Sequence, residues 1–354
     1  MKAMTEEQSV KLKAFLNCFV EYPLLTEIMG DFDRLRQNRL LGGDQQCMLL
    51  TGDTGCGKSH LIRYYQSREQ SEPKGRFDSS PILVSRIPSK LSLEETVLQL
   101  LKDLGQFGTT TRGRSRITTD SSLTHSLVEL LRKKQVELII INEFQELIEY
   151  KSAEKKQAIA NRLKYISEEA GVPIVLVGMP WAEMIAEEPQ WSSRLVTRRS
   201  LPYFKLSEDP VHFVQFLKGL AKKMPFDKPP KLEDKKTSIS LFAASRGELR
   251  ALRHLINDAV KDAVLEDERE FNVQRLHHSF TKLNPQVRNP FELPLNEIKL
   301  SEIEHYSGSG PAAKKKKLDG SGGYNPRAMS NDDALTNRMF SENIPLKELL
   351  KKKG

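Results

Sequence analysis

Two segments of the chain combine residue types that could bind and hydrolyse a nucleotide. The first, GDTGCGKS at residues 52–59, follows an apolar run and precedes a segment of helical pattern. It fits the P-loop pattern G-x-x-x-x-G-K-[ST], whose glycines let backbone N–H groups close around phosphate oxygens. In this pattern Lys58 reaches the β- and γ-phosphates, and the Ser59 hydroxyl takes a place on Mg²⁺. We therefore expect ATP and Mg²⁺ as cofactors, with nucleotide contacts from Gly52, Asp53, Thr54, Gly55, Cys56, Gly57, Lys58, Ser59 and His60.

The second segment, LIIINEFQEL at residues 138–147, is an apolar run that ends in polar residues. In P-loop ATPases one acidic residue at such a place holds Mg²⁺ and a second residue orients or polarises the attacking water. Glu143 is our candidate for the water-polarising role, but Asn142 stands where an aspartate is usual. Asn142 can hold Mg²⁺ through water yet carries no charge, so we expect weaker Mg²⁺ retention or slower turnover. The alternative is an ordinary buried strand that ends at a polar turn.

Arginines form a third group of candidates. In WSSRLVTRRSLPYF, Arg194 is the leading candidate for a catalytic arginine that acts on the γ-phosphate of a neighbouring subunit, and Arg198 is the second. A solvated basic turn or a contact with a phosphate backbone would explain the same cluster. In SRGELRALRHL, Arg250 lies one turn into a predicted helix and is a candidate nucleotide sensor, with surface helix charge as the alternative.

A basic segment at residues 105–120, GQFGTTTRGRSRITTD, is a candidate DNA-binding loop. It places Arg112, Arg114 and Arg116 among glycine, serine and threonine, and Lys102 lies on the preceding predicted helix. Arginines and hydroxyls suit contacts to DNA phosphates, which give affinity without reading sequence. A solvated loop without a ligand is the alternative.

The elements that must position these residues follow an alternating pattern. Short apolar runs predict buried parallel strands at residues 46–51, 81–88, 138–142 and 172–180, with helices at 5–40, 60–66, 91–104, 121–135 and 152–170. Strand and helix in alternation, with a phosphate loop after the first strand, predict a doubly wound α/β domain. We assign residues 1–40 to a helical lead-in, 41–206 to the P-loop core, 207–283 to a small helical lid and 284–307 to a tail.

The remaining sequence is interpreted from composition. The 354 residues, 38% hydrophobic, contain no apolar run that could span a bilayer and no signal-peptide core, so we expect no membrane contact and a cytoplasmic protein. Cys18, Cys47 and Cys56 lack disulfide or zinc spacing. Residues 308–323, GSGPAAKKKKLDGSGG, supply +3 of the net charge of +8, and we interpret them as an engineered linker with a nuclear localisation signal. Scattered apolar residues in 324–354 suit docking on the lid or on a partner.

The sequence resembles the AAA+ ATPases and, within them, the TnsC/TniB regulators of transposition. The resemblance lies in the order of its motifs: the P-loop, the acidic strand end, VPIVLVGMP, the SR pair and RGELRALRHLI. INEFQELIE and the long tail most resemble the TnsC proteins of CRISPR-associated transposons. The resemblance covers residues 10–290 and departs from the AAA+ pattern at Asn142 and at Met179, where a polar sensor is usual. It implies an ATPase that forms rings or filaments on double-stranded DNA. It also implies a transposase and a target-selection complex, TniQ with an RNA-guided CRISPR complex, as partners.

Two other functions fit the same residues. A helicase loader or clamp-loader-like AAA+ ATPase would have a similar basic loop and lid. A nucleotide-gated scaffold would bind ATP and oligomerise with little hydrolysis. ATP turnover and the form of the assembly on DNA separate these alternatives.

Overall fold

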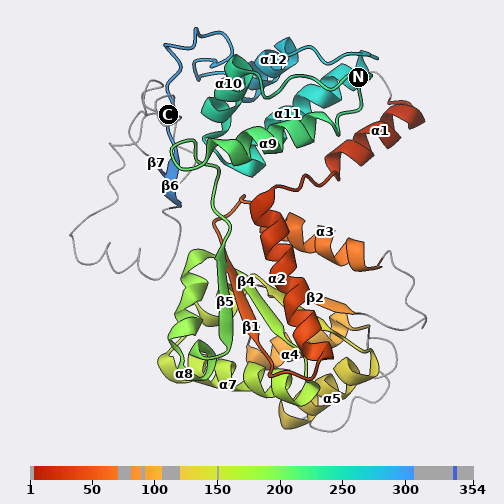
Figure 1. Cartoon of the computed structure of the whole chain (residues 1–354), viewed down its shortest axis with the longest axis vertical. Coiled ribbons are helices and arrows are strands. Elements are labelled where there is room, and N and C mark those ends of the chain that lie inside the picture. The colour runs from red at the N-terminus through yellow and green to blue at the C-terminus, as the bar shows by residue number, and fades with distance from the viewer. Residues whose placement is uncertain are drawn as a thin grey trace, which may run out of the picture. The chain divides into compact units, whose positions relative to one another are not determined.

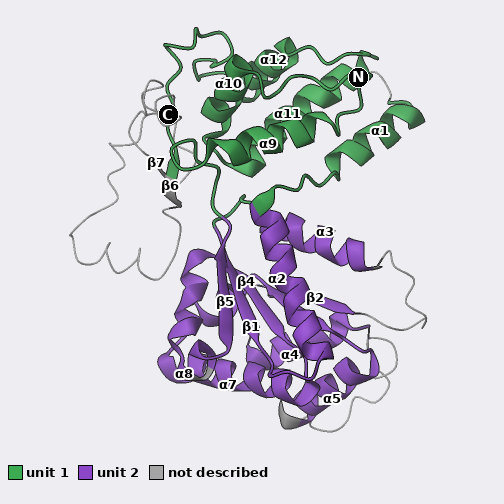
Figure 2. Cartoon of the chain, viewed as in Figure 1, with its two compact units in different colours: residues 1–23, 53–57, 202–354 green, residues 24–52, 58–201 purple. Residues whose placement is uncertain are grey.

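The computed structural model describes residues 4–70, 81–88, 92–105, 120–149, 151–306 and 338–340. In chain order the elements are α1 (Glu6–Leu16), α2 (Pro23–Leu40), β1 (Cys47–Thr51), α3 (Lys58–Gln70), β2 (Ile82–Arg86), α4 (Leu93–Asp103), α5 (Asp120–Lys133), β3 (Leu138–Asn142), α6 (Gln145–Ile148), α7 (Ala153–Ala170), β4 (Ile174–Gly178), the 3₁₀ helix η1 (Pro180–Glu187), α8 (Pro189–Ser192), β5 (Leu195–Ser200), α9 (Pro210–Ala221), α10 (Lys235–Ser245), α11 (Leu249–Leu265), α12 (Gln274–Leu283), β6 (Ile303–Tyr306) and β7 (Arg338–Phe340). They form two compact units (Figure 2). The first contains residues 1–23, 53–57 and 202–354, and the second contains residues 24–52 and 58–201.

A parallel five-stranded sheet forms the centre of the second unit, with the strand order β2-β3-β4-β1-β5 (Figure 1). Leu49 of β1 pairs with Leu176 of β4 on one side and with Arg198 of β5 on the other. Because all the strands are parallel, the residues that follow β1, β3 and β4 leave the sheet at the same edge. The chain crosses from β1 to the far strand β2, and ligands of open α/β sheets bind at such a turning point, outside the carboxyl ends.

The sheet is buried on both faces. Alternate strand residues such as Leu49, Ile139 and Leu176 join a hydrophobic cluster with helices α4, α5 and α7. Trp191 completes this cluster, and its indole N–H donates to the Ala160 carbonyl oxygen at 2.8 Å. Helix α2 crosses the sheet, since its arginines reach Thr197 of β5, Glu137 before β3 and the Gly171 carbonyl before β4. Burial on both sides explains the near-continuous apolar runs of the four predicted strands.

The edge strand β5 was not predicted from the sequence. Its residues LVTRRS alternate between buried Leu195 and Thr197 and exposed Val196 and Arg198. An edge strand meets solvent on one side and therefore lacks the continuous apolar run that marks a central parallel strand.

The first unit is mainly helical, and the prediction of an α/β core followed by a small helical part is confirmed. Helix α1 joins this unit through α11. The Gln8 side chain donates to the Val264 carbonyl at 3.1 Å, and Arg253 donates to the Phe15 and Leu16 carbonyls. Strands β6 and β7 pair antiparallel, with Ile303 opposite Phe340. Residues 308–323 and most of the tail 324–354 lie outside the described residues.

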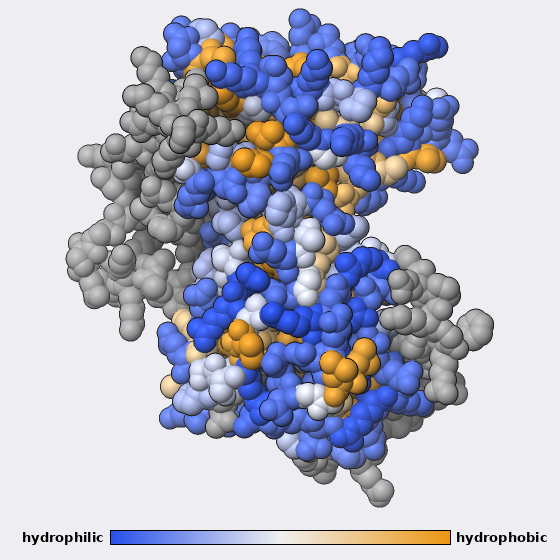
Figure 3. Space-filling view, in the orientation of Figure 1, coloured by the Kyte–Doolittle hydropathy of each residue, from blue (hydrophilic) through white to orange (hydrophobic). Residues whose placement is uncertain are grey.

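The face of the molecule in Figure 3 is mainly polar, with small apolar areas. Exposed large apolar side chains include Leu40, Leu41 and Val196. Apolar side chains exposed in this scattered way are ordinary on protein surfaces. Within the described ranges, the helices are too short or too polar to cross a membrane.

Candidate functional site

The P-loop joins β1 to α3, as the sequence predicted. In the sheet unit, the Gly52 N–H donates to the Gly178 carbonyl of β4 at 3.2 Å, which fixes the exit from β1. Lys58 begins α3, is 7% exposed, and its Nζ donates to the Gly52 carbonyl at 2.5 Å. The ammonium group therefore lies beside Gly52 at the amino end of α3, where anions are favoured by the N–H groups and the helix dipole.

The middle of the loop, residues 53–57, belongs to the helical unit. The Tyr203 hydroxyl donates to the Thr54 carbonyl at 2.6 Å, and the Arg250 N–H donates to the Gly55 carbonyl at 3.1 Å. These contacts turn two loop carbonyls toward protein donors. A backbone cradle for phosphate requires this, because its N–H groups and not its carbonyls must face the anion.

The two interior glycines of the loop share two reasons to be glycine. Gly55 and Gly57 have φ values of +82° and +109°, a region in which a side chain is strained. A Cβ on Gly55 would lie 2.3 Å from Oε1 of Glu248, and one on Gly57 would lie 2.8 Å from Leu249. Glu248 precedes α11 and is 3% exposed. The start of α11 therefore packs directly on the loop.

Asn142 and Glu143 lie beside the first turn of α3. The Asn142 Oδ1 accepts the Glu143 N–H at 3.1 Å, and its Nδ2 donates to the Ser59 Oγ at 3.3 Å. The Glu143 N–H can only donate, so it fixes which end of the amide faces Ser59. Glu143 has φ +60°, a left-handed value that is uncommon for a residue with a side chain. Ser59, Asn142 and Glu143, which are far apart in the sequence, thus meet at one edge of the sheet.

The arginines of the SR cluster lie elsewhere. Arg194 precedes β5, its carbonyl accepts the Cys47 N–H at 2.8 Å, and its guanidinium pairs with Glu168 of α7. Cys47 begins β1, whereas the P-loop follows the end of β1, so Arg194 is at the opposite edge of the sheet, roughly 13 Å of strand away. Arg198 is exposed on β5, and Arg199 donates to the buried Asp31 at 2.6 Å. A catalytic arginine at position 194 could serve only the site of another copy.

The remaining candidates are the nucleotide sensor Arg250 and the DNA-binding residues. Arg250 is exposed at the start of α11, and the contact that ties it to the loop is made by its backbone. Lys102 is exposed in the last turn of α4. Arg112, Arg114 and Arg116 lie outside the described residues. The roles assigned to all these residues stay predictions.

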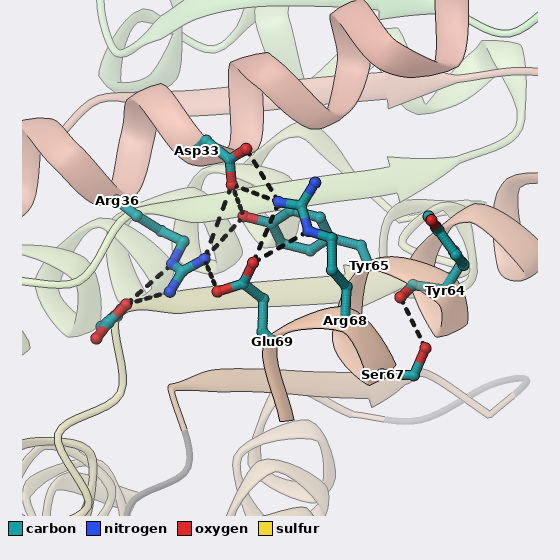
Figure 4. Close-up of polar contacts among 8 residues, drawn as sticks. Asp33, Arg36, Tyr64, Tyr65, Ser67, Arg68 and Glu69 are labelled. Atoms are coloured by element: carbon teal, nitrogen blue, oxygen red, sulfur yellow. Dashed lines mark hydrogen bonds and ion pairs between the residues drawn. The ribbon is translucent and has the colours of Figure 1, made fainter. Parts of the chain in front are cut away.

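A buried polar cluster braces α3, the helix that carries Lys58 and Ser59 (Figure 4). Arg36 of α2 pairs with Glu69 of α3 and with Glu137, both at 2.5 Å. The Tyr65 hydroxyl donates to Asp33 at 2.7 Å. Burial lowers the pKa of Arg36, but its hydrogen bonds to Tyr65, Glu137 and Glu69 outweigh this effect and raise the pKa. The guanidinium is therefore permanently charged, and α2, α3 and the start of β3 are held as one body.

Each unit contains contact residues that the sequence did not single out. In the sheet unit Gln145 contacts Glu143, and in the helical unit Tyr203 and Glu248 lie against loop residues 54 and 55, but no motif marks any of them as functional. Cys47 contributes to the core and not to chemistry, since burial raises the pKa of its thiol to about 11. Within the described residues, no three His, Cys, Asp or Glu side chains form a group that could hold a metal.

The parallel sheet, the P-loop after β1 and the polar end of β3 give the chain the AAA+ P-loop fold. Residues 16–206 match the family model described as "Bacterial TniB protein". This match spans more than half of the chain, and the chain belongs to the TniB family.

Solved structures share the fold at low sequence identity. ORC2 of Aeropyrum pernix, solved as ADPNP–ADP complexes, is 16% identical with a TM-score of 0.58, over 78% of this chain and 72% of that chain. Cdc6p of Pyrobaculum aerophilum is 14% identical with a TM-score of 0.54, over 80% and 75%. ORC1 of Aeropyrum pernix in complex with DNA is 16% identical with a TM-score of 0.53, over 96% and 95%. No curated protein matches the chain in sequence. These likenesses show the fold, and the activity has to be argued from the site.

Proposed function

We propose that this TniB-family chain is an ATPase that assembles on double-stranded DNA and couples target-site selection to transposase recruitment. The observation that carries the nucleotide part is the meeting of Lys58, Ser59, Asn142 and Glu143 at the carboxyl edge of the sheet. A lysine for the phosphates, a hydroxyl beside them and one carboxylate are the groups that ATP hydrolysis needs.

The residues at this edge fit Mg²⁺. Mg²⁺ prefers oxygen ligands and takes few from the protein when phosphates supply the rest. The Ser59 hydroxyl is the direct candidate, and Asn142, 3.3 Å from it, would act through water. When bound, Mg²⁺ neutralises charge on the phosphates. In hydrolysis a water oxygen bonds to the γ-phosphorus while the bond to the bridging oxygen breaks, and ADP leaves with the electron pair. Glu143 would polarise that water and accept its proton.

The positions of the arginines support hydrolysis that depends on assembly. Arg194 is at the sheet edge opposite Lys58, so an arginine acting at the γ-phosphate would come from a neighbouring copy. Arg198, exposed on the edge strand, is the second candidate. A ring or filament supplies such a neighbour at each site. The missing charge at Asn142 would slow turnover and prolong the ATP state.

Binding to DNA is proposed from charge and from family. The sequence of segment 105–120 contains Arg112, Arg114 and Arg116, and Lys102 is exposed on α4 shortly before it. An AAA+ protein of similar fold, ORC1 of Aeropyrum pernix, was solved in complex with DNA. Replacing Arg112 and Arg114 by alanine should flatten the salt dependence of duplex binding. Unchanged affinity and slope would show that the loop is not the contact.

The remaining parts of the proposal rest on the resemblance to TnsC of CRISPR-associated transposons. The partners of this chain would be a transposase and TniQ with an RNA-guided CRISPR complex. Its native location would be the bacterial cytoplasm, and the insert at 308–323 would direct this chain to a nucleus. A nucleotide-gated scaffold with little hydrolysis is the second candidate, and the uncharged Asn142 favours it.

Electron microscopy with duplex DNA tests the proposal. We expect rings or filaments around DNA with ATP or a slowly hydrolysed analogue, and none for Lys58→Ala. Assemblies that form equally without nucleotide would contradict it. A helicase or clamp loader would instead load a separate ring protein onto DNA.

A further inference from the structure

Gln145 links the two strand ends that flank the reacting site. It is the first residue of α6, three positions after the end of β3, and is 4% exposed. Its Nε2 donates to the Glu143 Oε2 at 2.8 Å, and its Oε1 accepts the Met179 N–H at 3.1 Å. The Met179 N–H can only donate and an ionised Glu143 carboxylate can only accept, so the two partners fix the orientation of the amide.

The fold makes room for this amide. Gly178 ends β4, and a Cβ there would lie 2.8 Å from the Gln145 Oε1 and 2.9 Å from the Ala182 Cβ. Glycine at position 178 has no need of a positive φ, because its φ is not in the left-handed region. Its value is the space that it leaves for Gln145 between β4 and η1.

The Glu143 carboxylate depends on this contact. In the part of the chain that the structure describes, Gln145 is the side chain that donates a hydrogen bond to it. The backbone of Glu143 is held separately, because its N–H donates to Asn142 and the next N–H, of Phe144, donates to the Val177 carbonyl at 2.9 Å. The backbone contacts fix the position of the Glu143 Cα, and Gln145 fixes the position of its carboxylate.

We propose that Gln145 is a positioning residue for ATP hydrolysis: its amide orients the Glu143 carboxylate and ties it to the end of β4 at Met179. The inference rests on the proposed ATPase function. A neutral amide suits the task, since it directs one carboxylate oxygen without placing a cation beside the group that must accept a proton. Met179 takes part through its backbone, so an apolar side chain there is compatible with this role.

Two substitutions separate the parts of the contact. Gln145→Met keeps the length of the side chain and removes both hydrogen bonds. Gln145→Glu can still accept from Met179 but turns an acceptor toward Glu143. For both variants we expect kcat to fall about 10- to 100-fold, with the Kd of a non-hydrolysable ATP analogue unchanged, because misplacing a reacting group costs rate and not binding.

Gln8→Met is the matched control. Gln8 is also buried, and in the helical unit its amide donates to the Val264 carbonyl and to Asp267 and accepts the Thr5 N–H. It should lose a comparable amount of stability in urea unfolding while keeping kcat.

A double-mutant cycle decides between positioning and a general structural role. In a Glu143→Gln background, measured by single-turnover hydrolysis, adding Gln145→Met should cause no further loss, because the group that it positions has gone. An additive loss, or loss of analogue binding by Gln145→Met, would overturn the inference. Unchanged kcat in Gln145→Met, with an active wild type, would also overturn it and leave the proposed function intact. A wild type no faster than Lys58→Ala would instead refute the proposed function.

Discussion

Replacing Asn142 by aspartate tests how the uncharged strand end sets the rate of hydrolysis. The two side chains have the same shape, so the Glu143 N–H can keep its acceptor at 3.1 Å, while the Ser59 hydroxyl gains a carboxylate in place of an amide donor at 3.3 Å. Substituting a residue that orients a metal ligand without touching the metal typically changes metal affinity or activity 10- to 100-fold. We expect Asn142→Asp to lower the Mg²⁺ concentration for half-maximal ATP turnover by about tenfold or more, and to raise kcat.

The same substitution should destabilise the chain when Mg²⁺ is absent. Asn142 is 7% exposed, and a second carboxylate next to Glu143 in the chain would repel it at a cost on the order of 1–3 kcal/mol. Thermal unfolding measures both effects of Asn142→Asp. The substitution should lower the Tm in EDTA and raise it in Mg²⁺–ATP. Asn38→Asp on α2 is the control: it also loses an amide donor, the one that bonds to Gln46, and should shift neither the Mg²⁺ dependence nor kcat. If Asn142→Asp changes neither the Mg²⁺ concentration for half-maximal turnover nor kcat, the proposal that residue 142 acts on the metal is wrong.

Three further predictions concern the brace, the loop and the neighbouring copy. Arg36→Met should lower the free energy of unfolding by about 2–3 kcal/mol in urea titrations, because it removes the cation that pairs with the half-buried Glu137 and Glu69, of which, among the described residues, only Glu69 keeps a second partner, Arg68; a loss under 1 kcal/mol would contradict this. Burial raises the pKa of Glu69, but Arg36 and Arg68 together lower it below its ordinary value, so the wild type should lose this stabilisation as pH falls below about 4.5, and Arg36→Met should show a weaker dependence. Gly55→Ala should weaken ATP-analogue binding at least tenfold in calorimetry, since φ is +82°; unchanged affinity would show that the loop tolerates a side chain. Arg194→Ala and Lys58→Ala should each be inactive alone and regain ATPase activity when mixed; no recovery would count against an arginine acting between copies.

The sequence predicted the sheet well where burial leaves a clear mark. The strand at Leu138–Asn142 was predicted to the residue, and the P-loop was placed correctly between β1 and α3. Both follow from local patterns, namely a run of apolar residues and a fixed spacing of glycine, lysine and serine. The edge strand β5 carries no such run, because it is half exposed, and its arginines suggested a turn.

The supporting contacts of the site could not be predicted in this way. Gln145 is one polar residue at the start of a short helix, and its partner Met179 is 34 residues away and contributes a backbone N–H. Glu248 faces Gly55 across almost two hundred residues of chain. Such contacts depend on which strand ends share an edge, and that is set by strand order and not by local pattern. The orientation of the Asn142 amide likewise follows from a hydrogen bond that only the folded turn creates.

The most direct test of the central claim is the rate of ATP hydrolysis by the whole chain with saturating Mg²⁺–ATP, with and without duplex DNA. We predict slow turnover that DNA stimulates, no activity for Lys58→Ala, and ATP binding without turnover for Glu143→Gln. Many turnovers per second without DNA would contradict the account. So would a rate that Glu143→Gln leaves unchanged.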